Sequence, residues 1–200
     1  MQNPSAPAIV LASSSPYRRA LLERFLDNYE TVSPDIDESN GSGLKPAELA
    51  THLARKKAEA VAITSRDSLV IGADQLAVLN NTVLGKPGAH QRAGEQLLAA
   101  SGQVVTFLTA VCILDPVNRT RYEHIDKTMV SFREFDRRLA EAYLRLDEPY
   151  DCAGSFKLEG AGFVLFESVK TDDPTALIGL PMIWVADRLL QLGYLSTQGN

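Results

Sequence analysis

The sequence predicts an α/β fold, of the mixed α+β kind, with a central mixed sheet. Apolar runs of strand length alternate with segments of helical periodicity along the 200 residues. No segment repeats with a period of about 20 to 50 residues, which argues against a solenoid or a propeller. Since no proline-rich linker divides the chain, we expect one domain over residues 1–200.

The first strand is expected over Ala8–Ala12 because these residues are apolar and a turn signal follows them. Ser15 is a preferred N-cap and Pro16 suits the first helical position, so a helix follows directly. This helix is expected to end near Asp27, because four apolar residues share one face: Leu21, Leu22, Phe25 and Leu26. A second strand is expected over residues 29–32.

Pro46 opens a longer helix. The residues expected to face inward from it are Leu49, Leu53, Ala60 and Ile63. A strand over residues 68–78 follows, and Asn80-Asn81 predicts a hairpin turn into a short strand at 82–84. Gly85-Lys86-Pro87 then ends that strand.

The remaining elements follow the same alternation. A helix is expected over residues 90–101, and two long strands over residues 104–114 and 120–132. Asp136 is placed to cap a helix that runs to Leu146. After a glycine-rich stretch, a strand over Phe163–Val169 and an amphipathic helix over Pro181–Leu192 complete the fold.

The composition excludes several classes of protein. With 20 Lys and Arg against 25 Asp and Glu, the net charge of −5 argues against a nucleic acid polymer as partner. It is compatible with a small anionic ligand, because a few clustered cations suffice to hold a phosphate. The longest nearly apolar run, Val104–Leu114, is far shorter than the ~20 residues that span a bilayer. With no basic segment before Ala8 and only two cysteines, we expect a cytoplasmic protein without a disulfide scaffold, a zinc ribbon or a membrane anchor.

The start of the first helix is a candidate phosphate site. Residues 13–19 combine three serine hydroxyls, the free amides of a helix N-terminus and two arginines. Taken alone, the same residues are more typical of a serine cap with solvated arginines.

Acidic residues form a second group of candidates. Asp37-Glu38, with Asp35 before them, are hard oxygen ligands suited to Mg²⁺ or Mn²⁺, although such residues are also common in solvated loops. Asp74 lies in an apolar strand, where a carboxylate is costly to bury unless it is paired, binds a metal or takes part in catalysis. We therefore favour a functional role for Asp74.

Two lysines complete the set. Lys57 lies in the second helix and Lys86 between a glycine and a proline; each alone is typical of a solvated surface residue. Carboxylates, several cations and a phosphate site together are what metal-assisted attack on a nucleotide polyphosphate requires. Because the chain has no P-loop motif, hydrolysis is expected rather than energy coupling.

An ordered series of motifs spans the chain from about residue 9 to residue 193 and resembles the Maf family of nucleotide pyrophosphatases. Its pieces are Leu11-Ala12-Ser13-Ser14-Ser15-Pro16 with Arg18-Arg19, Asp37-Glu38, Leu53-Ala54-Arg55-Lys56-Lys57-Ala58, Gly72-Ala73-Asp74-Gln75, Gly85-Lys86-Pro87, Cys152-Ala153-Gly154-Ser155-Phe156-Lys157, Glu159-Gly160 and Gly179-Leu180-Pro181. No single piece is decisive, but the ordered series is highly specific.

The resemblance implies a cytoplasmic protein of the ITPase-like fold, with two lobes around a cleft and often a homodimer. It implies hydrolysis of a nucleoside triphosphate to the monophosphate and pyrophosphate with a divalent metal cation, Mg²⁺ or Mn²⁺. The implied proton acceptor is Asp74, which together with Glu38 would bind the metal. The implied phosphate-binding residues are Ser13, Arg18, Lys57 and Lys86.

The family has branches, and three positions distinguish them. The branch that acts on dTTP and UTP carries arginine, threonine and glutamine where this chain has Tyr17, Gln75 and Glu159. The chain instead resembles the branch that hydrolyses 7-methyl-GTP, with a house-cleaning role against modified nucleotides. Gln75 and Glu159 match that branch, whereas Tyr17 stands where tryptophan is expected.

Physical chemistry supports the same branch. Methylation at N7 makes the guanine ring cationic, and an aromatic face such as that of Tyr17 attracts a cation by roughly 0.5–2 kcal/mol. The smaller tyrosine ring is expected to stack more weakly than tryptophan, which lowers the expected selectivity over GTP. Glu159 can accept hydrogen bonds from the N1 and N2 edge of guanine, and its negative charge attracts the positive charge of the base.

Three other functions remain open at this point. The nearest is a pyrophosphatase for other ordinary or modified nucleotides, such as GTP, UTP or dTTP. A second is a non-catalytic nucleotide-binding regulator of cell division that acts through a partner; the intact set of Asp74 and lysines counts against it. An RNA-binding module conflicts with the acidic charge and the aromatic content of 7%.

Overall fold

A seven-stranded mixed sheet forms the centre of the computed structural model, which describes residues 2–3, 5–38, 43–115 and 118–195. Its strands are β1 (Ile9–Ala12), β2 (Glu30–Val32), β3 (Leu69–Leu79), β4 (Thr82–Leu84), β5 (Val104–Asp115), β6 (Thr120–Phe132) and β7 (Phe166–Lys170). The α-helices of the described residues are α1 (Pro16–Leu22), α2 (Pro46–Ala62), α3 (His90–Ala100), α4 (Arg137–Asp147) and α5 (Met182–Gln191). Three short 3₁₀ helices complete them: η1 (Ala153–Ser155), η2 (Gly162–Leu165) and η3 (Ala176–Ile178). The expected α/β class with a mixed sheet is confirmed.

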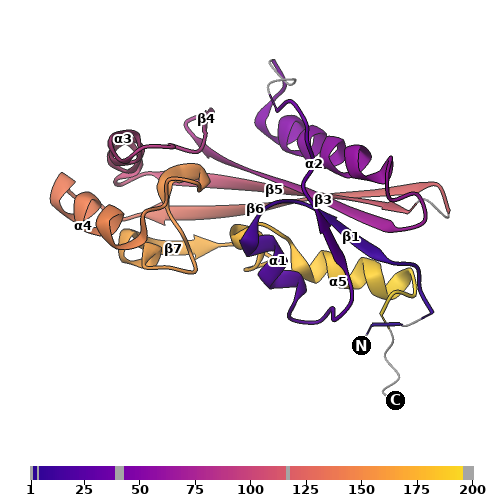
Figure 1. Cartoon of the computed structure of the whole chain (residues 1–200). Helices are drawn as coiled ribbons and strands as arrows, with labels where there is room; N and C mark the ends of the chain where they lie inside the picture. Colours follow the sequence, from indigo (N-terminus) through magenta and orange to yellow (C-terminus); the bar gives the residue numbers. More distant parts are fainter. Residues whose placement is uncertain (1, 4, 39–42, 116–117, 196–200) are drawn as a thin grey trace.

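Helices cover both faces of this sheet (Figure 1). Along β1 and β3 the side chains alternate between the two faces. Odd-numbered residues such as Leu11 and Ile71 pack with α1 and α5, and even-numbered residues such as Val10 and Val70 pack with α2. A further apolar cluster joins the distal end of β3 to α3, α4 and β7. The core therefore lies in two halves that share the long central strands. Among the described residues, no helix has the length and apolarity to cross a membrane.

One edge of strand β3 pairs with two different strands along its length. Its first part, Leu69–Gly72, pairs in parallel with β1, and its last part, Ala77–Leu79, pairs with β4. Between them, residues 73–76 have no strand partner on that edge among the described residues, while β5 pairs continuously along the other edge. Asp74 and Gln75 are thus held by β5 at the point where the sheet opens. Such openings beyond the carboxyl end of a parallel strand are where α/β sheets bind ligands.

The predicted turns and caps are confirmed where they depend on local chemistry. Asn80 and Asn81 both have positive φ, 49° and 64°, as the predicted two-residue hairpin between β3 and β4 requires. Asp136 caps α4, its Oδ1 accepting from the amide of Leu139 at 3.0 Å. Ser15 caps α1 through a longer bond, 3.4 Å, to the amide of Arg18.

The inward face of α2 differs from the prediction. Ile63 is 68% exposed, and Leu49 and Ala60 are only half-buried; of the four predicted residues only Leu53 is buried. The helix instead buries a mostly small-residue face: Ala50, Leu53, Ala54, Lys57, Ala58 and Val61. Small residues are required because the helix backbone approaches β3 closely at Gly72. A Cβ at Gly72 would lie 2.4 Å from the Ala54 carbonyl oxygen and 2.6 Å from the Ala58 amide nitrogen.

Two boundaries were also predicted wrongly. Helix α1 ends at Leu22 rather than near Asp27; Leu26 is nevertheless buried, in the segment that follows the helix. The last strand begins at Phe166 rather than Phe163, because residues 162–165 form η2. Phe163 is 63% exposed, so the apolar run that predicted the strand is not fully buried.

The close contact at Gly72 predicts a large effect of a small substitution. Gly72→Ala should lower the free energy of unfolding by about 3 kcal/mol or more, since two backbone atoms of α2 would have to move. Denaturant unfolding measures this. Gly85→Ala is the matched control, because a Cβ there meets nothing within 4 Å, and should change stability by no more than about 0.5 kcal/mol. Equal stabilities of the two variants would contradict the proposed close contact.

Candidate active site

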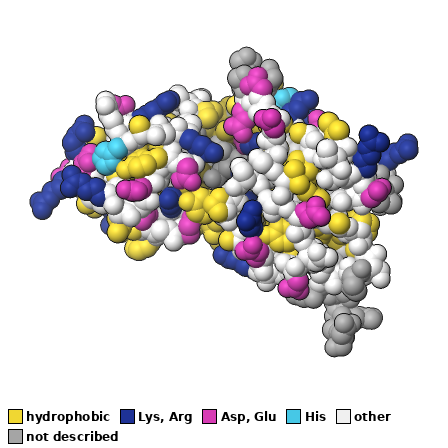
Figure 2. Space-filling model, viewed as in Figure 1, with side chains coloured by type: hydrophobic (Ala, Val, Ile, Leu, Met, Phe, Trp, Pro, Cys, Tyr) yellow, Lys and Arg dark blue, Asp and Glu magenta, His cyan; other side chains and the backbone are white. Residues whose placement is uncertain are grey.

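A cavity of about 300 Å³ lies where the sheet opens between the ends of β1 and β4. Charged groups of both signs surround the hollow between the two halves of the molecule (Figure 2). Its walls come from eight separate parts of the chain: the start of α1, the segment between β2 and α2, α2 itself, β3, the segment after β4, β5, residues 151–159 and residues 177–179. The predicted site residues that line it are Ser13, Tyr17, Arg18, Glu38, Lys57, Gln75, Lys86 and Glu159. The remaining predicted residue, Asp74, lies directly behind Lys57 and is bonded to it.

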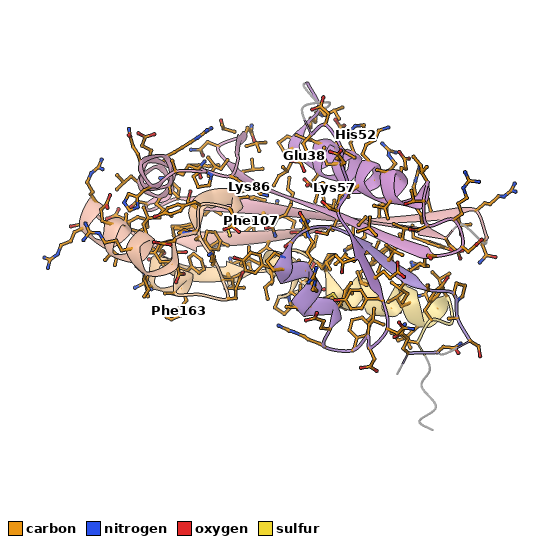
Figure 3. All side chains as sticks on the ribbon, in the orientation of Figure 1. Glu38, His52, Lys57, Lys86, Phe107 and Phe163 are labelled. Carbon is orange, nitrogen blue, oxygen red and sulfur yellow. The ribbon has the colours of Figure 1, made fainter. Side chains whose placement is uncertain are left out.

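Lys57 lies at the centre of a charged cluster at one end of the cavity. Its Nζ lies 2.6 Å from Asp74 Oδ1 and 2.8 Å from Glu38 Oε1, so one ammonium bridges two carboxylates. Figure 3 shows Lys57 projecting from α2 beside Glu38, with Lys86 and Phe107 nearby and Phe163 far away. The Gly72 contact explains this placement. Ala58, next to Lys57, packs on Gly72, and Asp74 is two residues further along the same face of β3.

Asp74 is a buried carboxylate with one oxygen unused. Its side chain is only 8% exposed, and no described residue hydrogen-bonds to Oδ2. Burial raises the pKa of Asp74 above its ordinary value, and the charges of Lys57 and Arg18 offset this only in part. A buried acceptor without a partner is costly, so Oδ2 requires a hydrogen-bond donor or a cation. Such a group suits a general base.

Glu38 has a different environment from Asp74. Burial acts to raise its pKa, but the hydrogen bond and charge of Lys57, with the charges of Lys86 and Arg18, bring the pKa below its ordinary value. Its side chain is 61% exposed to the solvent. Glu38 is therefore ionised and accessible at neutral pH, as a metal ligand must be.

Arg18 is held in place by two neighbours. Its Nε donates to the carbonyl of Gly179 at 2.9 Å, and its Nη1 donates to Ser13 Oγ at 3.3 Å, which also accepts from the amide of Ser15 at 3.1 Å. Burial lowers the pKa of Arg18, but a guanidinium remains protonated. With Lys57 and Lys86, Arg18 gives this end of the cavity three cations.

The opposite end of the cavity combines an aromatic face with carboxylates. Burial raises the pKa of Tyr17, whose hydroxyl interacts with the Lys157 ammonium. Burial also raises the pKa of Glu159, and the carboxylate accepts from its own amide. Asp151 lines the same end, its Oδ1 3.9 Å from Lys157 Nζ. At this end of the cavity, the two carboxylates of Asp151 and Glu159 outnumber the one ammonium of Lys157.

Gln75 is bound to the wall of the cavity. Its Nε2 donates to Thr109 Oγ1 at 3.0 Å, to the Ala176 carbonyl at 2.8 Å and to the Leu177 carbonyl at 3.1 Å. Asp74 and Gln75 are consecutive, so their side chains leave β3 on opposite faces. Asp74 turns toward α2 and Gln75 toward η3.

Several cavity residues were missed by the sequence prediction. Gly179 and Leu177, together with Ala176 behind the cavity wall, act through backbone carbonyls, which leave no side-chain signal. Phe107, which is buried in β5, contributes to the cavity wall but follows the ordinary alternation of a strand. The motif Cys152–Lys157 was recognised, but no role was predicted for Lys157.

The carboxylates are consistent with a metal that is shared with the substrate. Within the described ranges, no three Asp, Glu, His or Cys side chains gather closely enough to hold an ion. Mg²⁺ is commonly held by only one or two carboxylates together with substrate phosphates and water. Glu38 and the free Oδ2 of Asp74 offer two such ligands beside the three cations.

Comparison with known proteins gives a consistent result. The family model described as "Maf-like protein" matches residues 8–192. A protein of Alkalilimnicola ehrlichii is 50% identical over 188 residues, covering 94% of each chain, and one of Cupriavidus metallidurans is 47% identical over 196 residues, covering 97% of this chain and 98% of its own. A protein of Pseudomonas syringae pv. tomato is 49% identical over 187 residues, covering 94% of this chain and 97% of its own. All three are named 7-methyl-GTP pyrophosphatase.

Among solved structures, the Ham1 protein of Staphylococcus aureus matches with a TM-score of 0.44 and 19% identity. The match covers 64% of this chain and 72% of that one.

The bridge between Lys57 and Asp74 predicts a coupling between two substitutions. Lys57→Met should cost about 3–5 kcal/mol of stability, because it leaves Asp74 charged and buried without its partner. Adding Asp74→Asn removes that charge and should restore most of the loss, measured by denaturant unfolding. Lys56→Met is the control, since its pair with Glu59 is exposed and should cost less than about 1 kcal/mol. A Lys57→Met variant as stable as Lys56→Met would rule out a stabilising bridge.

Proposed function

The chain belongs to the Maf family, and from this premise we propose that it hydrolyses 7-methyl-GTP to 7-methyl-GMP and pyrophosphate. The observation that carries the proposal is the division of charge within one cavity. Cations gather at the end that contains Asp74, and an aromatic face with carboxylates lies at the other. A triphosphate fits the first end and a cationic base the second. The enzyme would remove a modified nucleotide before it is used.

At the phosphate end, Arg18, Lys57 and Lys86 bind the triphosphate and oppose the charge that develops as pyrophosphate leaves. Arg18 needs little reorganisation for this, because Gly179 and Ser13 already fix its guanidinium. The hydroxyl of Ser13 lies beside it and contributes to the same phosphate-binding loop. Preorganised donors of this kind are worth more than mobile ones.

Asp74 acts on the attacking water. Its free Oδ2 accepts a proton from a water molecule, and the oxygen of that water attacks the α-phosphorus as the bond to the β-phosphate oxygen breaks. Because burial raises its pKa, Asp74 is a stronger base than an exposed aspartate. Lys57 holds the carboxylate in the orientation that leaves Oδ2 free.

We also propose that the reaction requires a divalent cation, Mg²⁺ or Mn²⁺. Glu38 and Asp74 would hold it together with the phosphates of the substrate. When bound, such an ion neutralises negative charge on the phosphates and polarises the α-phosphoryl group.

At the base end, Tyr17, Gln75 and Glu159 select the nucleotide. The tyrosine ring offers an aromatic face to the positively charged 7-methylguanine. The negative charge of Glu159 attracts this positive ring, and its carboxylate accepts hydrogen bonds from the N–H groups of the base.

The two cysteines, Cys112 and Cys152, are free thiols, which supports a further proposal that the enzyme acts in the cytoplasm.

Asp74→Asn tests the reaction. This substitution should reduce turnover roughly 10²- to 10⁴-fold while the fold persists. Pyrophosphate release is measured for 7-methyl-GTP, GTP, UTP and dTTP, with Mg²⁺, with Mn²⁺ and with a chelator. We expect the wild type to act best on 7-methyl-GTP and only with a metal, and the exposed control Asp67→Asn to match it.

Two results would contradict this proposal. Near-normal pyrophosphate release by Asp74→Asn would remove Asp74 as the base. Tight nucleotide binding without product under every metal condition would favour a non-catalytic regulator.

Glu159→Gln tests the selection of the base. Replacing a charge-assisted hydrogen bond by a neutral one should lower the preference for 7-methyl-GTP over GTP by about fivefold, seen in the ratio of kcat/KM values. Glu167→Gln removes the same charge from an exposed position on β7 and should leave the ratio unchanged. An unchanged preference in Glu159→Gln would show that Glu159 does not select the base.

A further inference from the structure

Thr109 is a buried hydroxyl that the reaction as described does not use. It lies on β5 directly opposite Gln75 of β3, and its residue is fully buried. Its Oγ1 donates to the Ala176 carbonyl at 2.9 Å and accepts from Gln75 Nε2 at 3.0 Å. Thr109 therefore joins Gln75 to the loop that forms one wall of the cavity.

These contacts fix which way the Gln75 amide points. Three oxygen atoms surround Nε2, two of them backbone carbonyls at 2.8 and 3.1 Å. With the amide turned over, Oε1 would face those carbonyls with no proton between them. Thr109 adds to this constraint, because its single proton is given to Ala176 and its oxygen is left as an acceptor.

The fixed amide leaves one group for a ligand. Gln75 lines the cavity, and no described residue donates a hydrogen bond to Oε1. Gln75 therefore presents an acceptor, and Glu159, which also lines the cavity, presents another. The edge of guanine carries two donors, N1–H and the N2 amine, whereas adenine has the acceptor N1 at the corresponding place.

We propose that Thr109 is a positioning residue for base selection. It holds Gln75 with the acceptor oxygen toward the cavity, so that Gln75 and Glu159 together accept the two donors of a guanine base. The inference rests on the proposed function, because it concerns the guanine part of the same substrate.

The first test compares two bases of equal charge in the wild-type enzyme. 7-Methyl-GTP and 7-methyl-ATP both carry the methyl group and the positive ring. The ratio of their kcat/KM values therefore reports how the enzyme recognises the hydrogen-bonding edge of the base. We expect 7-methyl-GTP to be favoured by about a hundredfold, since unpaired polar groups in a site built for hydrogen bonding penalise the wrong base. A ratio near one would overturn the inference.

The second test removes the hydroxyl. Thr109→Val removes one of the three acceptors around Gln75 Nε2 and the donor to the Ala176 carbonyl, which loosens the hold on the Gln75 amide. The ratio should then fall by about tenfold, whereas Thr109→Ser keeps the hydroxyl and should keep the ratio. Thr128→Val is the matched control, because Thr128 is also a buried threonine, on the neighbouring strand β6 and away from the cavity lining. If Thr109→Val does not fold, Thr109→Ala takes its place.

The outcomes separate the inference from the proposed function. A folded Thr109 variant without the hydroxyl that keeps the wild-type ratio would overturn the role of Thr109. If the wild type does not hydrolyse 7-methyl-GTP, the proposed function fails. The ratio is then measured with GTP and ATP, and a loss of guanine preference in Thr109→Val still supports the positioning role.

Discussion

The close contact between α2 and β3 at Gly72 is the constraint on which the end of the cavity around Lys57 and Asp74 depends. Because glycine has no Cβ, the backbone of the helix lies against the strand at Ala54 and Ala58. This contact fixes the height of Lys57 above the sheet, and the ammonium then meets Asp74 at 2.6 Å. A wider spacing would leave a buried carboxylate without its counter-charge, which few folds tolerate.

The alternation of side chains along β3 sends Asp74 and Gln75 to opposite faces of the sheet. Asp74 and Gln75 are neighbours in sequence, yet one side chain meets α2 and the other meets the loop at η3. Their backbones are held in register with Ala110 and Thr109 of β5. One rigid segment thus sets the positions of the Asp74 carboxylate and the Gln75 amide together, so a shift of one would displace the other.

Local signals predicted a large part of this structure. The serine and aspartate caps, the Asn80-Asn81 turn and the mixed sheet follow from short-range preferences, and eight of the nine predicted site residues line one cavity. The burial of Ile63 was predicted wrongly, because the prediction chose large apolar residues. The face of α2 that packs on Gly72 consists mostly of small ones, and Ile63 follows the end of the helix. The carbonyls of Gly179, Ala176 and Leu177 could not be predicted, since backbone groups are the same in every residue.

The change of partner along β3 determines how the cleft can open. The two halves of the core are not separate bodies on a hinge, since β3 and β5 run unbroken through both and are paired along nearly their whole shared length. Rotating one half against the other would break ladder hydrogen bonds in the middle of the sheet. Residues 176–179 are likewise tied to Arg18, Gln75 and Thr109 by hydrogen bonds. Any opening of the cleft therefore has to come from the other segments at its rim, such as residues 151–159, while the width of the sheet beneath them stays constant.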